Sequence, residues 1–225
     1  TFHPAYVLRE PRWRGTALSD VRKALRFFED RLTWRDPEML FRPSWEDAAG
    51  FLGVVRDRTS SSGWRGTPGK GAAFDFETDS LEPERTVVRC LGIGGATRVM
   101  VLPFASVEKG KGPTPFYRAD DKERIEDIAA AWLRGPRLKV GHNANLFDAM
   151  VSEAFFGAIP TPIVDTMLLH KVVQPDLPHG LAYLGSILTD IHRWKRGDPG
   201  VNARSDRELW IYNALDVAVT ATIFP

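Results

Sequence analysis

The spacing of apolar residues divides the chain into a short helical beginning and a longer region of strands and helices. Apolar residues recur every three to four positions over 17–31, which predicts an amphipathic helix, and a second helix is expected to start at Ser44 after a proline. The stretch 59–71 is rich in Gly and Ser. We interpret it as a linker between a helical N-terminal segment, 1–58, and a domain over 72–225.

Beyond this linker, β-rich runs appear first and then alternate with helical ones. The predicted elements are strands at 72–76, 86–93, 97–102, 138–140 and 163–165, and helices at 121–134, at 146–156, and from Thr166, His179 and Ser205. Three consecutive strands followed by alternating helices and strands predict an α/β fold, a mixed sheet with flanking helices.

Composition narrows the class of protein. The 225 residues are 43% hydrophobic and 26% charged, which is typical of a globular chain with a core. No apolar run approaches the roughly 20 residues that span a bilayer, so we expect no membrane partner. The single cysteine, Cys90, cannot form a disulfide within the chain and is typical of a cytoplasmic protein.

The net charge of +1 argues against a protein that holds long duplex DNA through many phosphate contacts. It leaves open a site that holds a few nucleotides through metal ions.

The first candidate site is an acidic pair on the strand at 72–76 and just beyond it. Residues two apart on a strand point to the same face, so Asp75 and Glu77 project together while Phe74 and Phe76 enter the core. Two neighbouring carboxylates raise each other's pKa, and a divalent cation would relieve the repulsion. Solvated acids at a strand end are the more common explanation of such a pair taken alone.

Two further carboxylates lie in helical contexts. Asp148 falls in the first turn of the helix predicted at 146–156, where the helix dipole also favours an acid. Tyr212 and Asp216 lie one turn apart on an apolar helix, and a buried carboxylate there needs a partner. A Tyr–Asp hydrogen bond within a core would also account for that pair.

Taken together, these motifs resemble the DEDD exonuclease superfamily, in its tyrosine-containing branch, which includes the proofreading domains of family A DNA polymerases. The sequence Phe-Asp-Phe-Glu-Thr-Asp-Ser-Leu over 74–81 is similar to the first motif, and Tyr212-x-x-x-Asp216 to the third. The middle motif departs from the common form because Asn143 lies one residue further from Asp148, a spacing also found in phage-type polymerases. The resemblance covers about 72–225 and implies a ribonuclease H-like fold.

The resemblance also implies a function. The chain would be a 3′–5′ exonuclease that removes 5′-mononucleotides from DNA 3′ ends with two divalent cations, Mg²⁺ or Mn²⁺. Asp75, Glu77, Asp148 and Asp216 would hold the metals, and Tyr212 would orient the attacking water. Hard oxygen ligands suit these two ions, which agrees with the four carboxylates.

Four further residues are candidates for binding the 3′ end of single-stranded DNA: Thr78, Leu81, Asn143 and Phe147. By resemblance, Leu81 would contact the terminal base. An ordinary core residue at a strand end is the alternative for that leucine.

The first nine residues, Thr-Phe-His-Pro-Ala-Tyr-Val-Leu-Arg, are similar to the last motif of bacterial-type uracil-DNA glycosylases, whose His-Pro pair belongs to the uracil pocket. The water-activating motif of that family is absent from this sequence, so base excision is not expected. A vestigial tail, chance similarity and a fragment of a larger glycosylase–exonuclease–polymerase protein all remain open. We favour the fragment, which makes a covalently linked polymerase domain an expected partner.

The preferred hypothesis is therefore the proofreading module of a phage-like or bacterial family A DNA polymerase. It would act in the cytoplasm, that of the host if the protein is phage-encoded. Two alternatives stay open: an RNA-trimming exonuclease of the same superfamily, and an inactive nucleic-acid-binding or scaffolding module.

Overall fold

The computed structural model describes residues 2–53, 71–83, 85–106, 112–195 and 205–224. Its strands are β1 (Glu38–Phe41), β2 (Gly71–Thr78), β3 (Val88–Gly94), β4 (Arg98–Pro103), β5 (Ala105–Ser106), β6 (Thr114–Pro115), β7 (Leu138–Gly141) and β8 (Ile163–Asp165). Its helices are α1 (Pro4–Arg9), the 3₁₀ helix η1 (Pro11–Trp13), α2 (Arg14–Phe28), α3 (Trp45–Leu52), α4 (Ala119–Arg134), α5 (Phe147–Phe156), α6 (Thr166–Val173), α7 (Leu181–Leu188) and α9 (Asp206–Ile223).

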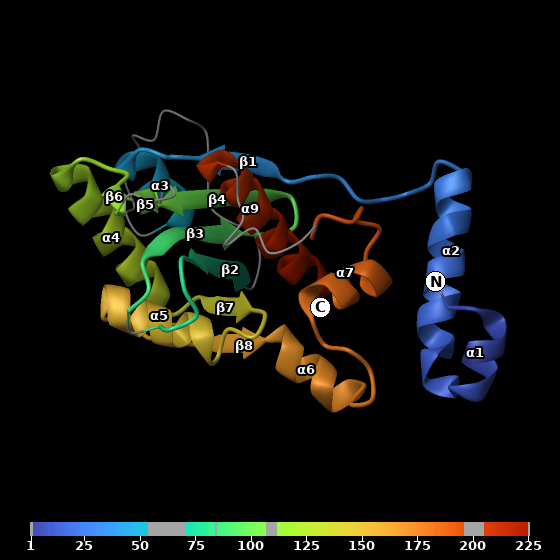
Figure 1. The fold of residues 1–225 in the computed structure, drawn as a ribbon. Coiled ribbons are helices and arrows are strands. Elements are labelled where there is room, and N and C mark those ends of the chain that lie inside the picture. Colours follow the sequence, from blue (N-terminus) through green and yellow to red (C-terminus); the bar gives the residue numbers. More distant parts are fainter. Residues whose placement is uncertain (1, 54–70, 84, 107–111, 196–204, 225) are drawn as a thin grey trace.

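A six-stranded mixed sheet forms the centre of the molecule, in the order β1-β4-β3-β2-β7-β8 (Figure 1). Strands β2, β3 and β4 form an antiparallel meander, while β1, β7 and β8 each run parallel to their neighbour. This confirms the predicted α/β class with a mixed sheet and flanking helices. None of the described helices is long and apolar enough to cross a membrane.

The two faces of the sheet are covered by different helices. On one face, Phe74 and Phe76 of β2 pack with buried residues of α3 and α4, as their alternation predicts. On the other face, α9 packs over β2, β3 and β4, with Val217 against the core that contains Val99 and Val101. Side chains at odd-numbered positions of β2 therefore point toward α9, and this places the acidic pair.

The N-terminal half contributes a strand that the sequence analysis did not predict. Within the segment 1–58, interpreted as helical, β1 pairs in parallel with β4 from Glu38↔Arg98 to Phe41↔Val101. Four residues are too few to show a strand periodicity, which explains the omission. The following helix, α3, begins after Ser44 as predicted, and the Ser44 hydroxyl accepts a hydrogen bond from the Asp47 N–H.

The linker predicted at 59–71 lies outside the described residues, apart from Gly71, the first residue of β2. At the N-terminus, the His3 imidazole accepts a hydrogen bond from the Ala5 N–H and caps α1. The glycosylase-like interpretation of this segment stays a prediction.

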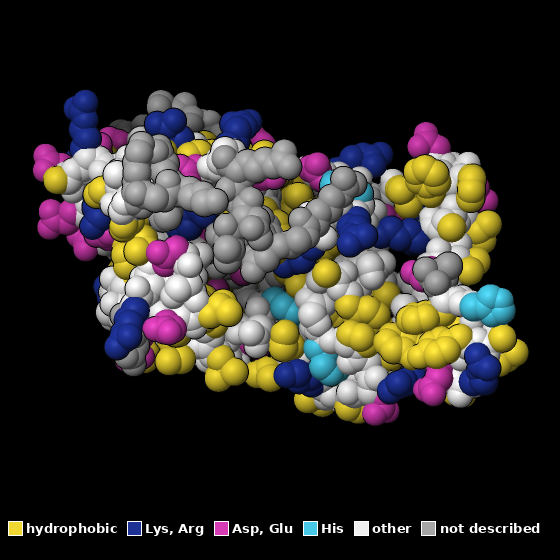
Figure 2. Space-filling view, viewed as in Figure 1, with side chains coloured by type: hydrophobic (Ala, Val, Ile, Leu, Met, Phe, Trp, Pro, Cys, Tyr) yellow, Lys and Arg dark blue, Asp and Glu magenta, His cyan; other side chains and the backbone are white. Residues whose placement is uncertain are grey.

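The helix predicted at 17–31 is α2, shifted by three residues at each end, and it stands beside α7 rather than on the sheet (Figure 1). The apolar residues that predict it point largely to solvent: Leu18, Val21, Leu25 and Phe28 are 46–83% exposed. Figure 2 shows this apolar surface along α2. The helix therefore docks through its polar side.

One polar contact of α2 reaches a buried carboxylate, that of Asp190. Arg26 donates from Nε and Nη2 to Asp190 Oδ1 at 3.2 and 2.6 Å, and Thr33 donates from its backbone N–H and its hydroxyl to Oδ2 at 3.0 and 2.9 Å. Beside them, Lys23 donates to the carbonyls of Thr189 and Ile191. We call Arg26, Thr33 and Asp190 the α2 clasp.

Candidate active site

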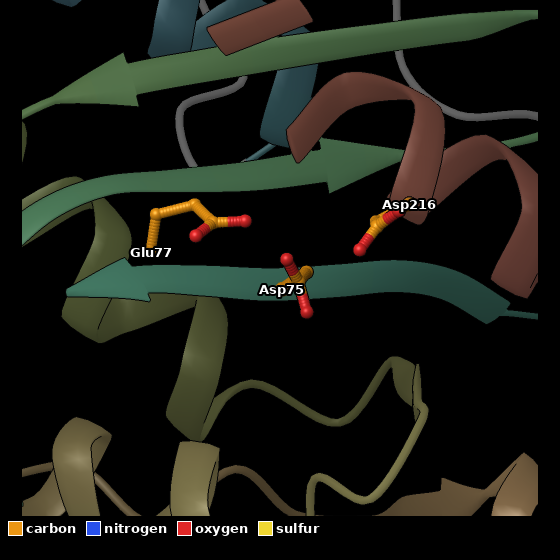
Figure 3. Close-up of side chains that lie close together, drawn as sticks. All are labelled: Asp75, Glu77 and Asp216. Carbon is orange, nitrogen blue, oxygen red and sulfur yellow. The ribbon is translucent and has the colours of Figure 1, made fainter. Parts of the chain in front are cut away.

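Three carboxylates meet between β2 and α9. Alternation along β2 turns Asp75 and Glu77 toward α9, from which Asp216 points back at Asp75 (Figure 3). One oxygen from each of the three carboxylates lies within 4.8 Å of the others. This spacing is small enough for the oxygens to bind one cation together.

Helix α9 positions Asp216 because it is buried along most of its length. Ser205 caps it by accepting a hydrogen bond from the Glu208 N–H, which confirms the predicted helix start. Tyr212 lies one turn before Asp216, whose side chain is only 6% exposed. The two residues face the site together, as predicted.

Asp148 approaches the same site from the opposite side of β2. It lies in the first turn of α5, is 6% exposed, and accepts a hydrogen bond at Oδ1 from the Phe76 N–H at 3.0 Å. This bond ties α5 to the strand between Asp75 and Glu77. The structure thus brings all four predicted carboxylates to one place.

The site is electrostatically unfavourable for its own charges. Burial, followed by the charges of Glu77, Asp148 and Asp216, raises the pKa of Asp75 well above its ordinary value. Burial raises the pKa of Asp148 to about 7, although the Phe76 N–H opposes the shift. Burial also raises the pKa of Asp216. A divalent cation would stabilise these carboxylates, and their hard oxygen atoms fit Mg²⁺ or Mn²⁺.

Sequence reasoning missed a lysine and a tryptophan that hold Asp216. Trp194 donates from Nε1 to Asp216 Oδ1 at 2.6 Å, and Lys195 donates from Nζ to Oδ2 at 2.5 Å and to the Tyr212 hydroxyl at 2.9 Å. They follow α7 in a stretch outside any helix or strand, so no hydrophobic period marks them. Their contacts with Asp216 and Tyr212 exist because the fold places this stretch next to α9.

Asn213 is a second residue that the sequence analysis missed. It is fully buried and donates from Nδ2 to the Asp75 backbone carbonyl at 3.1 Å and to Asp75 Oδ2 at 2.9 Å. Gly92 lies opposite Asp75 on β3, and a Cβ there would come within 2.3 Å of Asn213 Oδ1. A glycine at this position therefore makes room for the amide that orients Asp75.

The four residues predicted to bind substrate have different surroundings. Thr78, at the end of β2, donates from its hydroxyl to the Ser80 carbonyl at 2.8 Å. Leu81 is 87% exposed just beyond β2, so the alternative of an ordinary core residue is wrong. Asn143 has φ 62° in the loop before α5, and Phe147 packs partly buried against the core. Their contacts with substrate stay predictions.

Comparison with known proteins adds the family. The sequence profile of a family described as 3′–5′ exonuclease matches residues 68–225. No curated protein matches the sequence.

Several solved structures are similar in fold. NrnC of Brucella melitensis with bound Mg²⁺ is 19% identical, with a TM-score of 0.53 over 83% of this chain and 76% of that one. RNase D of Escherichia coli, an exoribonuclease involved in structured RNA processing, is 18% identical with a TM-score of 0.52, over 82% and 42% of the two chains. The catalytic core of RRP6 from Trypanosoma brucei is 15% identical with a TM-score of 0.55, over 86% and 48%. Identities this low show a shared fold.

Proposed function

The chain belongs to the 3′–5′ exonuclease family, and from this premise we propose that it removes 5′-mononucleotides from the 3′ end of single-stranded DNA. We further propose that it is the proofreading module of a family A type DNA polymerase, to which it would be covalently linked. The observation that carries the proposal is the meeting of Asp75, Glu77 and Asp216 within 4.8 Å, with Asp148 bound to the same strand. Metal-dependent phosphodiester hydrolysis needs such a cluster of oxygen ligands.

We assign the metal ligands by the resemblance of these motifs to those of the DEDD exonucleases. Asp75 lies centrally and would be shared by two cations, with Glu77 and Asp216 on the side of the attacking water and Asp148 on the other side. Bound there, Mg²⁺ or Mn²⁺ ions would supply a water of lowered pKa and stabilise the charge of the attacking and leaving oxygens. Asn213 would keep the Asp75 carboxylate in the orientation that this role needs.

Tyr212 would orient the attacking water. Burial, and then the charge of Asp216, raise the pKa of Tyr212 above its ordinary value, so its hydroxyl stays protonated at neutral pH. The group is therefore a hydrogen-bonding partner for the water and not its general base. Lys195 fixes the hydroxyl at 2.9 Å.

The substrate end would lie along the exposed end of β2. Leu81 would contact the terminal base with its exposed side chain. Thr78 ends β2, and Phe147 begins α5, the helix that carries Asp148, with Asn143 in the loop before it. The net charge of +1 suits a site that binds a few nucleotides.

A second candidate substrate is RNA. Among the solved structures of similar fold are an exoribonuclease, RNase D, and NrnC of Brucella melitensis bound to pGG. The similarity in fold to these proteins favours an RNA-trimming exonuclease as the alternative. It would act with the same carboxylates.

The test is degradation of a 5′-labelled single strand, as DNA and as RNA of the same sequence, with Mg²⁺, Mn²⁺ or EDTA. A metal-dependent ladder that shortens DNA from its 3′ end, faster at a mismatched primer end than at a matched one, supports the proofreading proposal. Faster shortening of RNA would favour the second candidate. Absence of degradation of both strands in both metals would contradict the proposed function.

A further inference from the structure

Lys195 contributes a cation to the site that the carboxylate motifs do not account for. Its ammonium lies 2.5 Å from Asp216 Oδ2 and 2.9 Å from the Tyr212 hydroxyl, and 4.9 Å from the centre of the Tyr212 ring. The side chain is one-quarter exposed, so most of it is shielded from solvent. One cation thus contacts two of the residues proposed to act in hydrolysis.

Asp216 has a protein donor on each of its two oxygens. Trp194 Nε1 donates to Oδ1 at 2.6 Å, and Lys195 donates to Oδ2. A neutral indole N–H leaves a lone pair of Oδ1 for another partner, whereas the lysine charge repels any second cation at Oδ2. A divalent cation at Asp216 must therefore compete with Lys195.

We propose that Lys195 is an internal counter-cation that occupies Asp216 in the metal-free protein and sets the metal concentration at which the nuclease becomes active. This inference rests on the proposed function, because it takes Asp216 to be a metal ligand. Lys195 acts here as a positioning residue for Asp216 and Tyr212.

The competition follows from the charges around the group. Asp75 and Glu77 from β2, Asp148 from α5 and Asp216 from α9 form a cluster of four carboxylates, which the Lys195 ammonium offsets in part. When a divalent cation binds, Lys195 loses its contact with Asp216 Oδ2. It keeps the Tyr212 hydroxyl, so the tyrosine stays oriented while the metal binds.

The test compares Mn²⁺ affinity with turnover. Titration calorimetry without substrate is performed on the wild type, on Lys195→Met and on Lys195→Arg, with Lys171→Met as a matched control on the exposed side of α6. Lys195→Met should bind Mn²⁺ about tenfold more tightly because the like charge is gone. It should also turn over more slowly because Tyr212 loses its partner. Lys195→Arg, which keeps the charge, should bind Mn²⁺ like the wild type.

The Mn²⁺ affinity of Lys195→Met separates the counter-cation role from a purely structural one. If folded Lys195→Met binds Mn²⁺ no more tightly than the wild type does, the counter-cation proposal is wrong, whatever happens to stability. If the wild type neither binds Mn²⁺ nor degrades DNA or RNA, the proposed function itself is wrong. The two failures are therefore distinguishable.

A measurement on the wild type keeps the proposal testable should Lys195→Met fail to fold. The ¹⁵N signal of the Lys195 ammonium, assigned by its loss in Lys195→Arg, should be visible and protected from exchange in EDTA. It should broaden or shift on adding Mg²⁺ as Asp216 is released. An Lys195 signal unchanged by saturating Mg²⁺ would overturn the proposal.

Discussion

Two buried carboxylate sites of this molecule have opposite electrostatics. In the α2 clasp, one carboxylate receives four hydrogen bonds from Arg26 and Thr33. Burial alone would raise the pKa of Asp190, but these bonds and the arginine charge lower it to about 2. In the candidate active site, burial raises the pKa of Asp148 to about 7 and, with the neighbouring carboxylates, also raises that of Asp75.

The partners of the two carboxylates differ. Asp190 is as buried as Asp148, at 8% and 6% exposed, yet its charge is stabilised by groups of the protein itself. Around Asp75, the negative charges of Glu77, Asp148 and Asp216 add to the effect of burial, and the site therefore favours a cation from solvent. A buried acid that is paired with cationic and neutral donors holds two elements together, whereas a cluster of acids that repel one another can bind a metal.

The largest expected effect comes from removing one charge of the active site. Asp75→Asn keeps the shape of the side chain but removes the central carboxylate. We expect nuclease turnover to fall by about three orders of magnitude or more, since the metal loses its shared ligand. In EDTA the melting temperature should rise by about a few degrees, because repulsion from Glu77, Asp148 and Asp216 is relieved.

Both readouts are needed for this variant. Thermal melts in EDTA and a gel assay in Mg²⁺ measure them separately on the same preparation. A lower melting temperature in EDTA would mean that the Asp75 charge is stabilised by the fold, and the contrast with Asp190 would disappear.

The reverse pattern is expected in the α2 clasp. Asp190→Ala leaves the Arg26 guanidinium and the Thr33 N–H without their acceptor, so the free energy of unfolding should fall by about 3 kcal/mol. Turnover per folded molecule should change less than about twofold well below the melting temperature. Urea denaturation measures the first, and the gel assay the second. The matched control is Asp176→Ala, an exposed aspartate whose loss should change neither quantity.

A loss of activity in folded Asp190→Ala would show that α2 and the active site act as one unit. The clasp would then contribute to activity as well as to stability.

The two sites also differ in how well the sequence predicts them. The active-site acids stand in short local patterns, such as the alternation of Asp75 and Glu77 and the helical spacing of Tyr212 and Asp216. Periodicity and a family resemblance were enough to find them. The clasp joins residues 164 and 157 positions apart, which no local pattern connects.

The same limit explains the other omissions. Lys195 and Asn213 become part of the site through contacts between elements, with Lys195 from a stretch outside any helix or strand. Strand β1 is defined by its pairing with β4 rather than by its four residues. The outward apolar face of α2 reverses the usual rule that an amphipathic helix buries its apolar side, since its polar side makes the specific contacts.

A pH titration of stability should give slopes of opposite sign for the two sites. The folded-state pKa of Asp148 is raised from 3.8 to about 7, so the folded protein binds more protons than the unfolded chain and stability falls as pH rises through this window. The pKa of Asp190 is lowered from 3.8 to about 2. The charge of Asp190 therefore stabilises the folded protein above pH 4, and this stabilisation is lost as the pH falls toward 2.

The variants separate these contributions from those of other groups. In EDTA, the gain in stability of Asp148→Asn over the wild type should grow from pH 4 to pH 7, and saturating Mg²⁺ should remove it. The loss of stability caused by Asp190→Ala should instead shrink as the pH is lowered from 4 to 2. Urea denaturation at several pH values measures both differences, and slopes of the same sign would show that the two sites do not differ in their electrostatics.

The smallest expected effect tests whether the clasp depends on the arginine alone. Thr33→Val removes one hydroxyl, which donates to Asp190 Oδ2 at 2.9 Å, and leaves the backbone N–H in place. Thr33 is exposed, so water can replace part of the bond. The free energy of unfolding should therefore fall by only about 0.5–1 kcal/mol. Thr97→Val, at an exposed threonine in the turn between β3 and β4, is the matched control for the change of hydroxyl to methyl.

The pKa of Asp190, followed by NMR in Thr33→Val, should move up from about 2 toward its ordinary value, because the hydroxyl is one of the groups that lower it. If neither quantity changes, Arg26 and the Thr33 N–H alone stabilise the Asp190 charge. A buried carboxylate would then need fewer donors than the clasp provides, and the raised pKa of Asp75 would have to be attributed to burial and the neighbouring negative charges alone.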